Sequence, residues 1–302
     1  MTFGPILVTG TAGQLAQALA RLAPARDMAV ICLGRPELDF DHPESLEAAF
    51  ASRPWAAIVN AAAYTAVDAA EQDEAAAQRA NRDGPATLAR LAAGAGIPFI
   101  HVSTDYVFDG DKGASYLETD PTNPTGAYGR TKRDGEEAVL AAGGRSVILR
   151  TAWVYSDTGK NFVRTMLGAG AKLPKLRVVG DQKGSPTAAA DLATAILDIL
   201  ALIAKTDWKP EYGGIFHATG SGETTWHGLA VATFAAAGPF GGPSPEVEAI
   251  RTADWPTPAR RPADSRLDNT KLARTFGVTL PPWRESLERT VASLLKGPDG
   301  RN

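Results

Sequence analysis

The first 150 residues alternate short apolar runs, typical of strands, with stretches typical of helices. The expected strands are residues 6–8, 29–33, 57–60, 98–103 and 146–150, and the expected helices are residues 14–22, 45–51, 68–81, 86–95 and 128–142. Such alternation is typical of a parallel sheet with helices packed on both faces. The sequence therefore predicts an α/β, doubly wound parallel sheet over residues 1–150.

The second half of the chain is organised differently. After about Thr151 the alternation loosens, and Gly, Pro and Trp become frequent. Residues 210–214 and 238–245 have the composition of loops. We interpret residues 151–302 mainly as a smaller substrate-binding cap domain, with a segment of about 187–217 returning to the sheet.

Composition narrows the class of protein. Apolar residues make up 44% of the 302 residues, charged residues 22%, and the formal net charge is −3, so no basic excess indicates a nucleic-acid partner. No apolar run has the length of a membrane span, and residues 1–5 lead into a strand without a basic, then apolar, leader pattern. Cys32 is the only cysteine, which excludes a disulfide framework and favours a cytoplasmic protein.

A glycine-containing loop follows the first expected strand and opens the first expected helix, at Thr9–Ala16. Gly10 permits a tight turn, Gly13 lets the backbone approach a pyrophosphate, and Ala16 lets the helix lie close to the strand. Backbone amides at the helix N-terminus then bind the anion. The spacing is Gly-x-x-Gly-x-x-Ala, and its position favours a dinucleotide-binding (Rossmann) loop over a plain strand-to-helix turn.

Two charged residues and an aromatic one follow the second expected strand. An acidic side chain here binds ribose hydroxyls, whereas an arginine accepts a 2′-phosphate. Arg35 is nearer the strand end than Asp39, so NADPH is favoured over NADH, and Phe40 is placed beside the adenine. The alternative interpretation of Arg35, and equally of Asp39, is a solvated surface residue.

Tyr128 and Lys132 are four residues apart on an expected helix, so both side chains share one face. A nearby ammonium favours a phenolate and lowers the pKa of the phenol from about 10. Alone, the pair also fits an exposed helical turn. Together with the phosphate loop and the Ser103–Asp105 cluster, it predicts a pair for proton transfer.

Seven segments carry a family resemblance: residues 59–68, 102–110, 128–132, 149–155, 181–187, 224–227 and 261–267. Through them the chain resembles the extended short-chain dehydrogenases/reductases, and within these the dTDP-4-dehydrorhamnose reductases. The resemblance covers nearly the whole chain. It implies a Rossmann fold and reduction of dTDP-4-dehydro-L-rhamnose, a 4-keto-6-deoxy sugar nucleotide, to dTDP-L-rhamnose with NADPH or NADH.

The resemblance also implies roles for single residues. Tyr128 would give its proton to the sugar C4 oxygen, and Thr104 would bind the same oxygen. Lys132 would bind the nicotinamide ribose. Asp105 would contact the substrate or tune this network, and Trp153 would pack on the sugar. The positions that match the family's cofactor contacts are Gly13, Gln14, Leu15, Asp39, Phe40, Ala63, Tyr64 and Thr65.

Two features depart from the family pattern. Tyr64 stands where many members have His, which alters a cofactor contact but not the proton donor. Some bacterial members bind Mg²⁺ and dimerise through C-terminal acidic residues. Here Glu285 and Glu288 are flanked by Arg284 and Arg289, a pattern that favours a surface ion-pair face over a hard-cation site. Mg²⁺ and the choice between monomer and homodimer stay open.

Other interpretations compete with the reductase. Nucleotide-sugar dehydratases place a glutamate after the threonine and aspartate, where this chain has Tyr106. A dehydratase or epimerase would retain its nicotinamide through the cycle. A non-catalytic dinucleotide-binding regulatory subunit is the second alternative. Among single residues, Thr104 and Asp105 could satisfy backbone groups, Trp153 could belong to the cap core, and His217 and His227 are expected to be structural.

Overall fold

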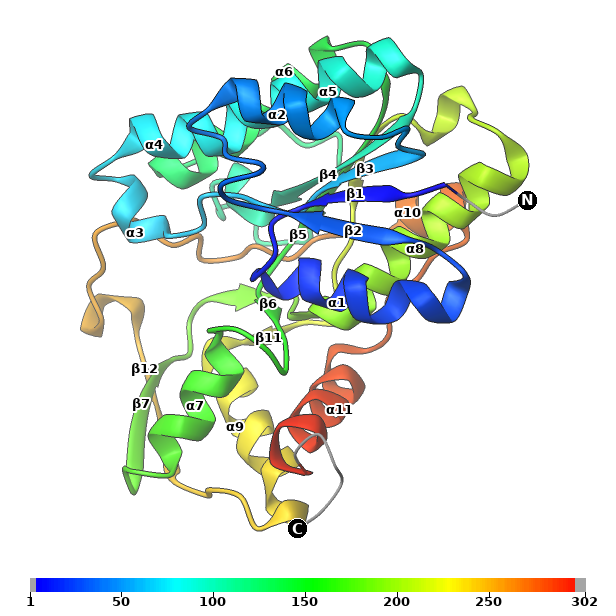
Figure 1. Ribbon diagram of the computed structural model, residues 1–302. Coiled ribbons are helices and arrows are strands. Elements are labelled where there is room, and N and C mark those ends of the chain that lie inside the picture. Colours follow the sequence, from blue (N-terminus) through cyan, green and yellow to red (C-terminus); the bar gives the residue numbers. More distant parts are fainter. Residues whose placement is uncertain (1–3, 297–302) are drawn as a thin grey trace.

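Six short strands form one sheet at the centre of the molecule (Figure 1). The computed structural model describes residues 4–296, so the expectation about the first residues falls partly outside it. All neighbouring strands of the sheet are parallel, in the order β10-β5-β4-β3-β1-β2. The strands are β1 (Ile6–Thr9), β2 (Val30–Leu33), β3 (Ala57–Asn60), β4 (Pro98–Thr104), β5 (Arg145–Thr151) and β10 (Gly214–His217).

Helices cover both faces of this sheet, because successive side chains of each buried strand point to opposite faces. Ile6 and Val8 pack with α1 and α8, whereas Leu7 packs with α2, α5 and α6. The helices of this part are α1 (Gln14–Leu22), α2 (Pro43–Ala51), α3 (Val67–Ala70), α4 (Glu74–Gln78), α5 (Gly84–Ala95), α6 (Ala127–Ala141), α8 (Ala189–Thr206) and α10 (Thr270–Phe276). The predicted doubly wound α/β fold is confirmed.

The topology also determines where a ligand binds. The chain passes from β1 to β2 on one side and places β3 on the other side of β1. The loops after β1 and β3 therefore leave the sheet in opposite directions and open a crevice at its carboxyl edge. A π-helical turn, η2 (Arg79–Asp83), links α4 to α5, and a 3₁₀ turn, η3 (Asp105–Val107), follows β4.

A second layer of helices and short strands lies beyond the carboxyl edge of the sheet, in the lower part of Figure 1. Its parallel strand pair, β7 (Lys175–Val179) and β12 (Glu246–Ile250), packs with α9, and α9 packs with α11. The remaining elements of this layer and its links are β6 (Val154–Tyr155), α7 (Phe162–Gly170), β8 (Lys183–Gly184), β9 (Thr187–Ala188), β11 (Thr224–Thr225), α9 (Trp226–Ala237) and α11 (Trp283–Lys296).

The chain returns from this layer to the sheet. Helix α8 packs along α1, and β10 pairs with β5 at the edge of the sheet. Residues 210–214 and 238–245 are less irregular than expected. Pro210–Tyr212 and Gly238–Phe240 are 3₁₀ turns with proline in their first positions, where its preset φ favours a helical start. Within residues 4–296, no helix has the length and apolarity needed to cross a membrane.

Candidate active site

A cavity of about 870 Å³ opens at the carboxyl ends of β1, β3, β4 and β5. It gathers side chains from loops that lie far apart in the sequence. The predicted residues that line it are Gly10, Gly13, Gln14, Leu15, Arg35, Phe40, Ala63, Tyr64, Thr65, Thr104, Asp105, Tyr128, Lys132 and Trp153. Asp39 is the one predicted site residue outside this lining.

The phosphate loop has the geometry that a dinucleotide needs. Gly10 adopts φ +88°, a left-handed conformation that glycine takes without strain. Gly13 is the N-cap of α1 and no side chain caps this helix end, so its first amides are available to an anion. A Cβ on Gly13 would meet nothing within 4 Å and would occupy the cradle itself. The loop therefore fits a pyrophosphate.

Charges at the rim of the cavity pair with one another. Arg35 Nε lies 3.1 Å from Asp39 Oδ1, and Arg35 Nη2 lies 3.2 Å from Asp41 Oδ2. Asp39 Oδ1 also accepts a hydrogen bond from the Asp41 amide. Asp39 thus turns toward the guanidinium, whereas Arg35 keeps 70% of its side chain exposed and lines the cavity. Of these three charged side chains, the arginine is the one that lines the cavity.

Tyr128 lies on the first turn of α6, at the base of the cavity, close to Thr104 of β4. Thr104 Oγ1 accepts a hydrogen bond from the Tyr106 amide and donates one to Asp105 Oδ1 at 3.0 Å. Tyr106 contacts the Tyr128 ring edge-on, with ring centroids 5.5 Å apart. Helix α6 begins where Glu71 Oε1 accepts the Ala127 amide at 2.7 Å. The phenol is therefore held from both sides.

The expected lowering of the pKa of Tyr128 by Lys132 is wrong in this structure. Burial raises the pKa of Tyr128 to about 12, while the neighbouring Thr104 hydroxyl opposes the rise and the Asp105 charge adds to it. The Lys132 ammonium instead donates to the Val102 carbonyl at 2.7 Å. Desolvation of the phenol outweighs any help that the ammonium gives the phenolate.

Lys132 and Asp105 are two buried charges whose pKa values move toward neutrality. Lys132 is 2% exposed, and burial lowers the pKa of its ammonium to about 8. Asp105 is also 2% exposed, and burial raises the pKa of its carboxyl to about 6. Ser265 lies beside this carboxyl, but no hydrogen bond of normal geometry reaches Asp105 Oδ2 within the described residues. Perturbed titratable groups of this kind cluster at functional sites.

Thr151 and Trp226 are two of the cavity residues that the sequence reasoning missed. Thr151 ends β5 beside Thr104, and within residues 4–296 its buried hydroxyl has no hydrogen-bond partner. The rule that ligands gather at the carboxyl ends of parallel strands is the signal that points to it. Trp226 was given no chemistry, yet it lines the cavity and stacks on Trp153 with ring centroids 3.6 Å apart.

Trp153 carries backbone strain at this site. Its φ of +49° is a left-handed conformation that bulky residues rarely adopt. A Cβ on Gly184 would lie 2.4 Å from the Trp153 ring, so the indole packs tightly between this backbone and its neighbour Trp226. The strain and the packing hold the indole at the cavity wall.

Other residues singled out in the sequence lie away from the cavity. His217 is fully buried, and burial lowers its pKa to about 3. His227 Nε2 lies 3.1 Å from the Val247 carbonyl oxygen. Glu285 and Glu288 are exposed but form no ion pair within residues 4–296, so the expected surface ion-pair face is wrong. Arg289 pairs with Asp191 of α8, and the Arg284 guanidinium lies over the Trp283 ring.

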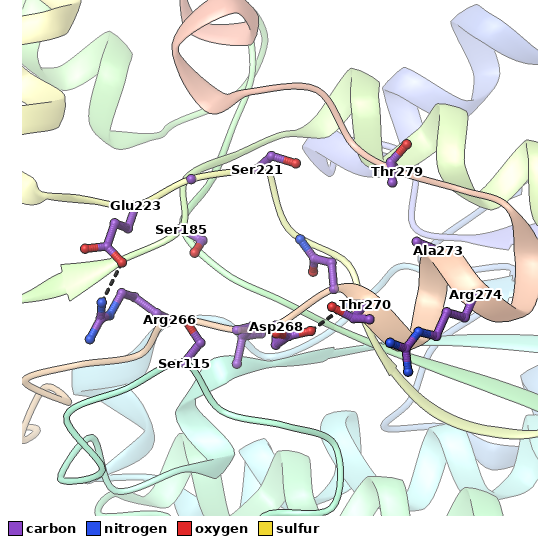
Figure 2. Close-up of a pocket in the computed structure, with 13 residues that line it drawn as sticks. Ser115, Ser185, Ser221, Glu223, Arg266, Asp268, Thr270, Ala273, Arg274 and Thr279 are labelled. Carbon is purple, nitrogen blue, oxygen red and sulfur yellow. Dashed lines mark hydrogen bonds and ion pairs between the residues drawn. The ribbon is translucent and has the colours of Figure 1, made fainter.

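Within the described part of the chain, no group of three or more His, Cys, Asp or Glu residues is placed to hold a metal ion. A second hollow, of about 560 Å³, lies between the loop at Ser221 and helix α10 (Figure 2). Two of its charged groups have partners: Arg266 Nη1 donates to Glu223 at 2.5 Å, and Asp268 accepts the Thr270 amide at 2.7 Å. Of the buried polar atoms without a partner in residues 4–296, Asp105 Oδ2 and Thr151 Oγ1 lie in the larger cavity, and others, such as those of His217 and Ser146, lie outside both hollows.

Comparison with known proteins agrees with this geometry. A family model described as the RmlD substrate binding domain matches residues 4–296. The chain belongs to this family. The chain is 46% identical, over 296 residues, to a dTDP-4-dehydrorhamnose reductase of Sinorhizobium fredii, covering 97% of this chain and 99% of that protein.

Solved structures resemble this member of the RmlD family over nearly its whole length. A dTDP-4-dehydrorhamnose reductase of Clostridium acetobutylicum has a TM-score of 0.87 and 36% identity, covering 95% of this chain and 98% of that chain. The enzyme of the same name from Bacillus anthracis, in complex with NADP, has a TM-score of 0.87 and 30% identity, with coverages of 95% and 98%. The Rossmann-type reductase fold is thus common to all three.

Proposed function

We propose that this protein reduces dTDP-4-dehydro-L-rhamnose to dTDP-L-rhamnose with NADPH, the last step of dTDP-L-rhamnose synthesis. One observation carries the proposal: Tyr128, Thr104 and Lys132 meet in a cavity that also contains the phosphate loop. The relatives of this family that are named dTDP-4-dehydrorhamnose reductases support the substrate and the direction of reaction. Family membership and site chemistry therefore point to the same activity.

The cofactor assignment rests on the loop and on Arg35. The amides at the start of α1 would bind the pyrophosphate, and Ala63, Tyr64 and Thr65 would flank the nicotinamide half. The exposed Arg35 guanidinium at the cavity rim would accept a 2′-phosphate, which favours NADPH over NADH. When bound, the cofactor would supply the hydride. The NADP complex of the Bacillus anthracis relative supports this choice.

The proton would come from Tyr128. With its pKa raised to about 12, the phenol is fully protonated at neutral pH, as a general acid must be. The alkoxide that forms at C4 is a much stronger base than a phenolate, so the proton moves downhill from the phenol. Thr104 would hold the carbonyl oxygen in place, and its hydroxyl favours the phenolate that remains. Lys132 would bind the cofactor ribose beside the phenol.

The second layer would hold the sugar nucleotide, as the cap that residues 151–302 were expected to form. Trp153 would pack on the sugar, with Trp226 fixing the plane of its indole. The free Asp105 Oδ2 and the Thr151 hydroxyl are unsatisfied groups that sugar hydroxyls would pair with. A dehydratase is disfavoured, because burial raises the pKa of Tyr106 far above neutrality where that class needs a carboxylate. We further infer a cytoplasmic location.

The test is to follow reduced-nicotinamide absorbance with purified protein and dTDP-4-dehydro-L-rhamnose. We expect stoichiometric oxidation of NADPH and formation of dTDP-L-rhamnose. Sugar conversion with a copurifying nicotinamide that is not consumed would indicate an epimerase or dehydratase instead. Dinucleotide binding without any turnover would indicate the regulatory alternative.

A further inference from the structure

One turn along α6 from Lys132, a polar cluster is closed off from solvent. Glu136 accepts hydrogen bonds from Arg150 Nε at 2.9 Å and Arg150 Nη2 at 2.6 Å. The Ser103 hydroxyl donates to the same carboxylate at 2.5 Å. The side chains of Glu136 and Arg150 are only 2% and 3% exposed. The cluster joins α6 to β4 and β5, and none of its members lines the cavity except Ser103.

Lys132 lies one turn before this carboxylate on α6, and Arg150 is the cation in direct contact with it. Residues four apart on a helix share a face, so Lys132 and Glu136 are neighbours along α6. The Lys132 ammonium has one hydrogen bond, to a backbone carbonyl, although the residue is almost fully buried. A buried ammonium is unstable without a counter-charge, and Glu136 is the group that raises the pKa of Lys132 against the effect of burial.

No other nearby group offers that counter-charge. His101 of β4 is fully buried, and its pKa is held well below the usual value by burial and by Lys132, so it stays neutral. Asp105 of η3 points its carboxylate to Thr104, and Tyr128 keeps its proton. The charged side chains of α3, α4 and η2 that border α6 are turned outward or paired at the surface: Asp68, Asp73, Glu74, Arg79, Arg82 and Asp83. Glu71 instead accepts the Ala127 amide at the N-terminus of α6, five residues before Lys132.

We propose that Glu136, clamped by Arg150, is a positioning residue that keeps the Lys132 ammonium charged and in place inside the protein. The inference rests on the proposed role of Lys132 in binding the cofactor ribose. Arg150 orients the carboxylate by two parallel hydrogen bonds, and Glu136 in turn acts on the lysine one turn away. The cluster thus sets the upper pH limit of activity.

The test is the pH profile of kcat/KM for NADPH in Glu136→Gln. Glutamine keeps the shape of the side chain and loses its charge. If the variant lowers the pKa of Lys132 by about one unit, activity falls about twofold at pH 7 and about eightfold at pH 8.5 relative to wild type. The basic limb of the profile therefore moves to lower pH. A purely structural role would lower activity by one factor at every pH, and that result would overturn the proposal.

Two further variants make the test specific. Glu137→Gln removes the adjacent charge on α6, which is exposed and 3.7 Å from Arg133, and should leave the basic limb in place. Glu136→Asp keeps the charge one methylene farther from Lys132. The basic limb of its pH profile should therefore lie between those of wild type and Glu136→Gln. If the glutamine variant does not fold, the aspartate variant decides: a limb at the wild-type position counts against the proposal.

Lys132→Met separates failure of this inference from failure of the proposed function. If Lys132→Met retains full activity, the proposed role of the lysine is wrong and the inference falls with it. If Lys132→Met is inactive while Glu136→Gln keeps the wild-type basic limb, only the role of Glu136 is wrong.

Discussion

Two hollows in the described part of the chain differ in how their polar groups are paired. In the pocket of Figure 2, Arg266 is held by Asp264 and Glu223, and these pairs raise its pKa. In the larger cavity, Asp105 Oδ2 and the Thr151 hydroxyl are buried without partners in the described residues. Buried polar groups are nearly always paired in folded proteins. Among the buried atoms without a partner in residues 4–296, those of Asp105 and Thr151 are the ones that line a cavity, where a ligand would supply the missing partner.

The same contrast holds for titration. Burial moves the pKa of Asp105 up to about 6 and that of Lys132 down to about 8, because neither charge has a full set of partners. In the smaller hollow, by contrast, the pKa of Arg266 is raised and the pKa of Asp268 is lowered, both away from neutrality, because each has hydrogen-bond partners. Paired charges stabilise a fold, whereas poorly solvated ones are retained for chemistry.

Tyr128→Phe should have the largest effect, because it removes the proton donor and leaves the cavity shape unchanged. We expect kcat to fall by about 10²–10⁴-fold with unchanged NADPH affinity, measured by steady-state kinetics and cofactor titration. Tyr106→Phe is the matched control, since it removes a neighbouring phenol that donates no proton in the proposed reaction. Equal losses in the two variants would show that Tyr128 acts through packing.

Asp105→Asn tests whether the cavity is a source of instability. A carboxyl whose pKa rises from 3.8 to about 6 binds its proton more tightly in the folded state. Stability from this group is therefore present below about pH 4 and is lost as pH rises to about 6. Above pH 6 the variant should be more stable than wild type by about 3 kcal/mol, and less active. Thermal unfolding at pH 4 and pH 8 measures the difference.

The control for this experiment is Asp109→Asn. Hydrogen bonds from Tyr116 and from the Asp111 amide lower the pKa of Asp109, so its contribution to stability is present at neutral pH and lost on acidification. The sign of its effect at pH 8 should be opposite to that of Asp105→Asn. Destabilisation by both variants at pH 8 would refute the comparison.

The sheet and the site loops could be predicted from sequence, because the residue types within each short segment indicate its structure. The strand at 57–60 is a short β run that its own residues indicate. Gly10 adopts a positive φ, as expected for a glycine in a tight turn after a strand. Local sequence patterns were therefore enough to predict both. The pKa of Tyr128 could not be predicted, because its burial, the Thr104 hydrogen bond and the Asp105 charge arise only when the fold brings these residues together. Spacing along one helix shows which side chains are neighbours but not how much water they lose.

Which side chains pair with one another could not be predicted from the sequence either. Asp39 and Arg35 were both expected at the cofactor, yet the Asp39 carboxylate pairs with the Arg35 guanidinium. Arg289 pairs with Asp191, about a hundred residues away in sequence, rather than with the glutamates beside it. Trp226 was overlooked because an aromatic residue before an apolar helix resembles core, and only the stacking on Trp153 reveals its position.

Arg35→Ala examines the cofactor end of the cavity. The exposed guanidinium is expected to contribute about 1 kcal/mol to NADPH binding, so its loss should raise the Kd for NADPH about fivefold and leave NADH unchanged. Fluorescence titration with both cofactors measures this. Arg79→Ala is the control, because Arg79 shares the Asp41 partner but does not line the cavity. Equal weakening of both cofactors by Arg35→Ala would exclude a 2′-phosphate contact.

Glu223→Gln should have the smallest effect and tests the other hollow. Glu223 is 53% exposed, and Arg266 retains Asp264 as a second partner, so the loss of one ion pair should cost less than about 0.5 kcal/mol. Activity should stay within about twofold of wild type, because the pocket in Figure 2 contains no group that the proposed reaction uses. Steady-state kinetics with the dTDP-sugar checks this. A tenfold rise in KM with unchanged kcat would mean that the substrate extends into this hollow, and the contrast between paired and unpaired pockets would then fail as a guide to function.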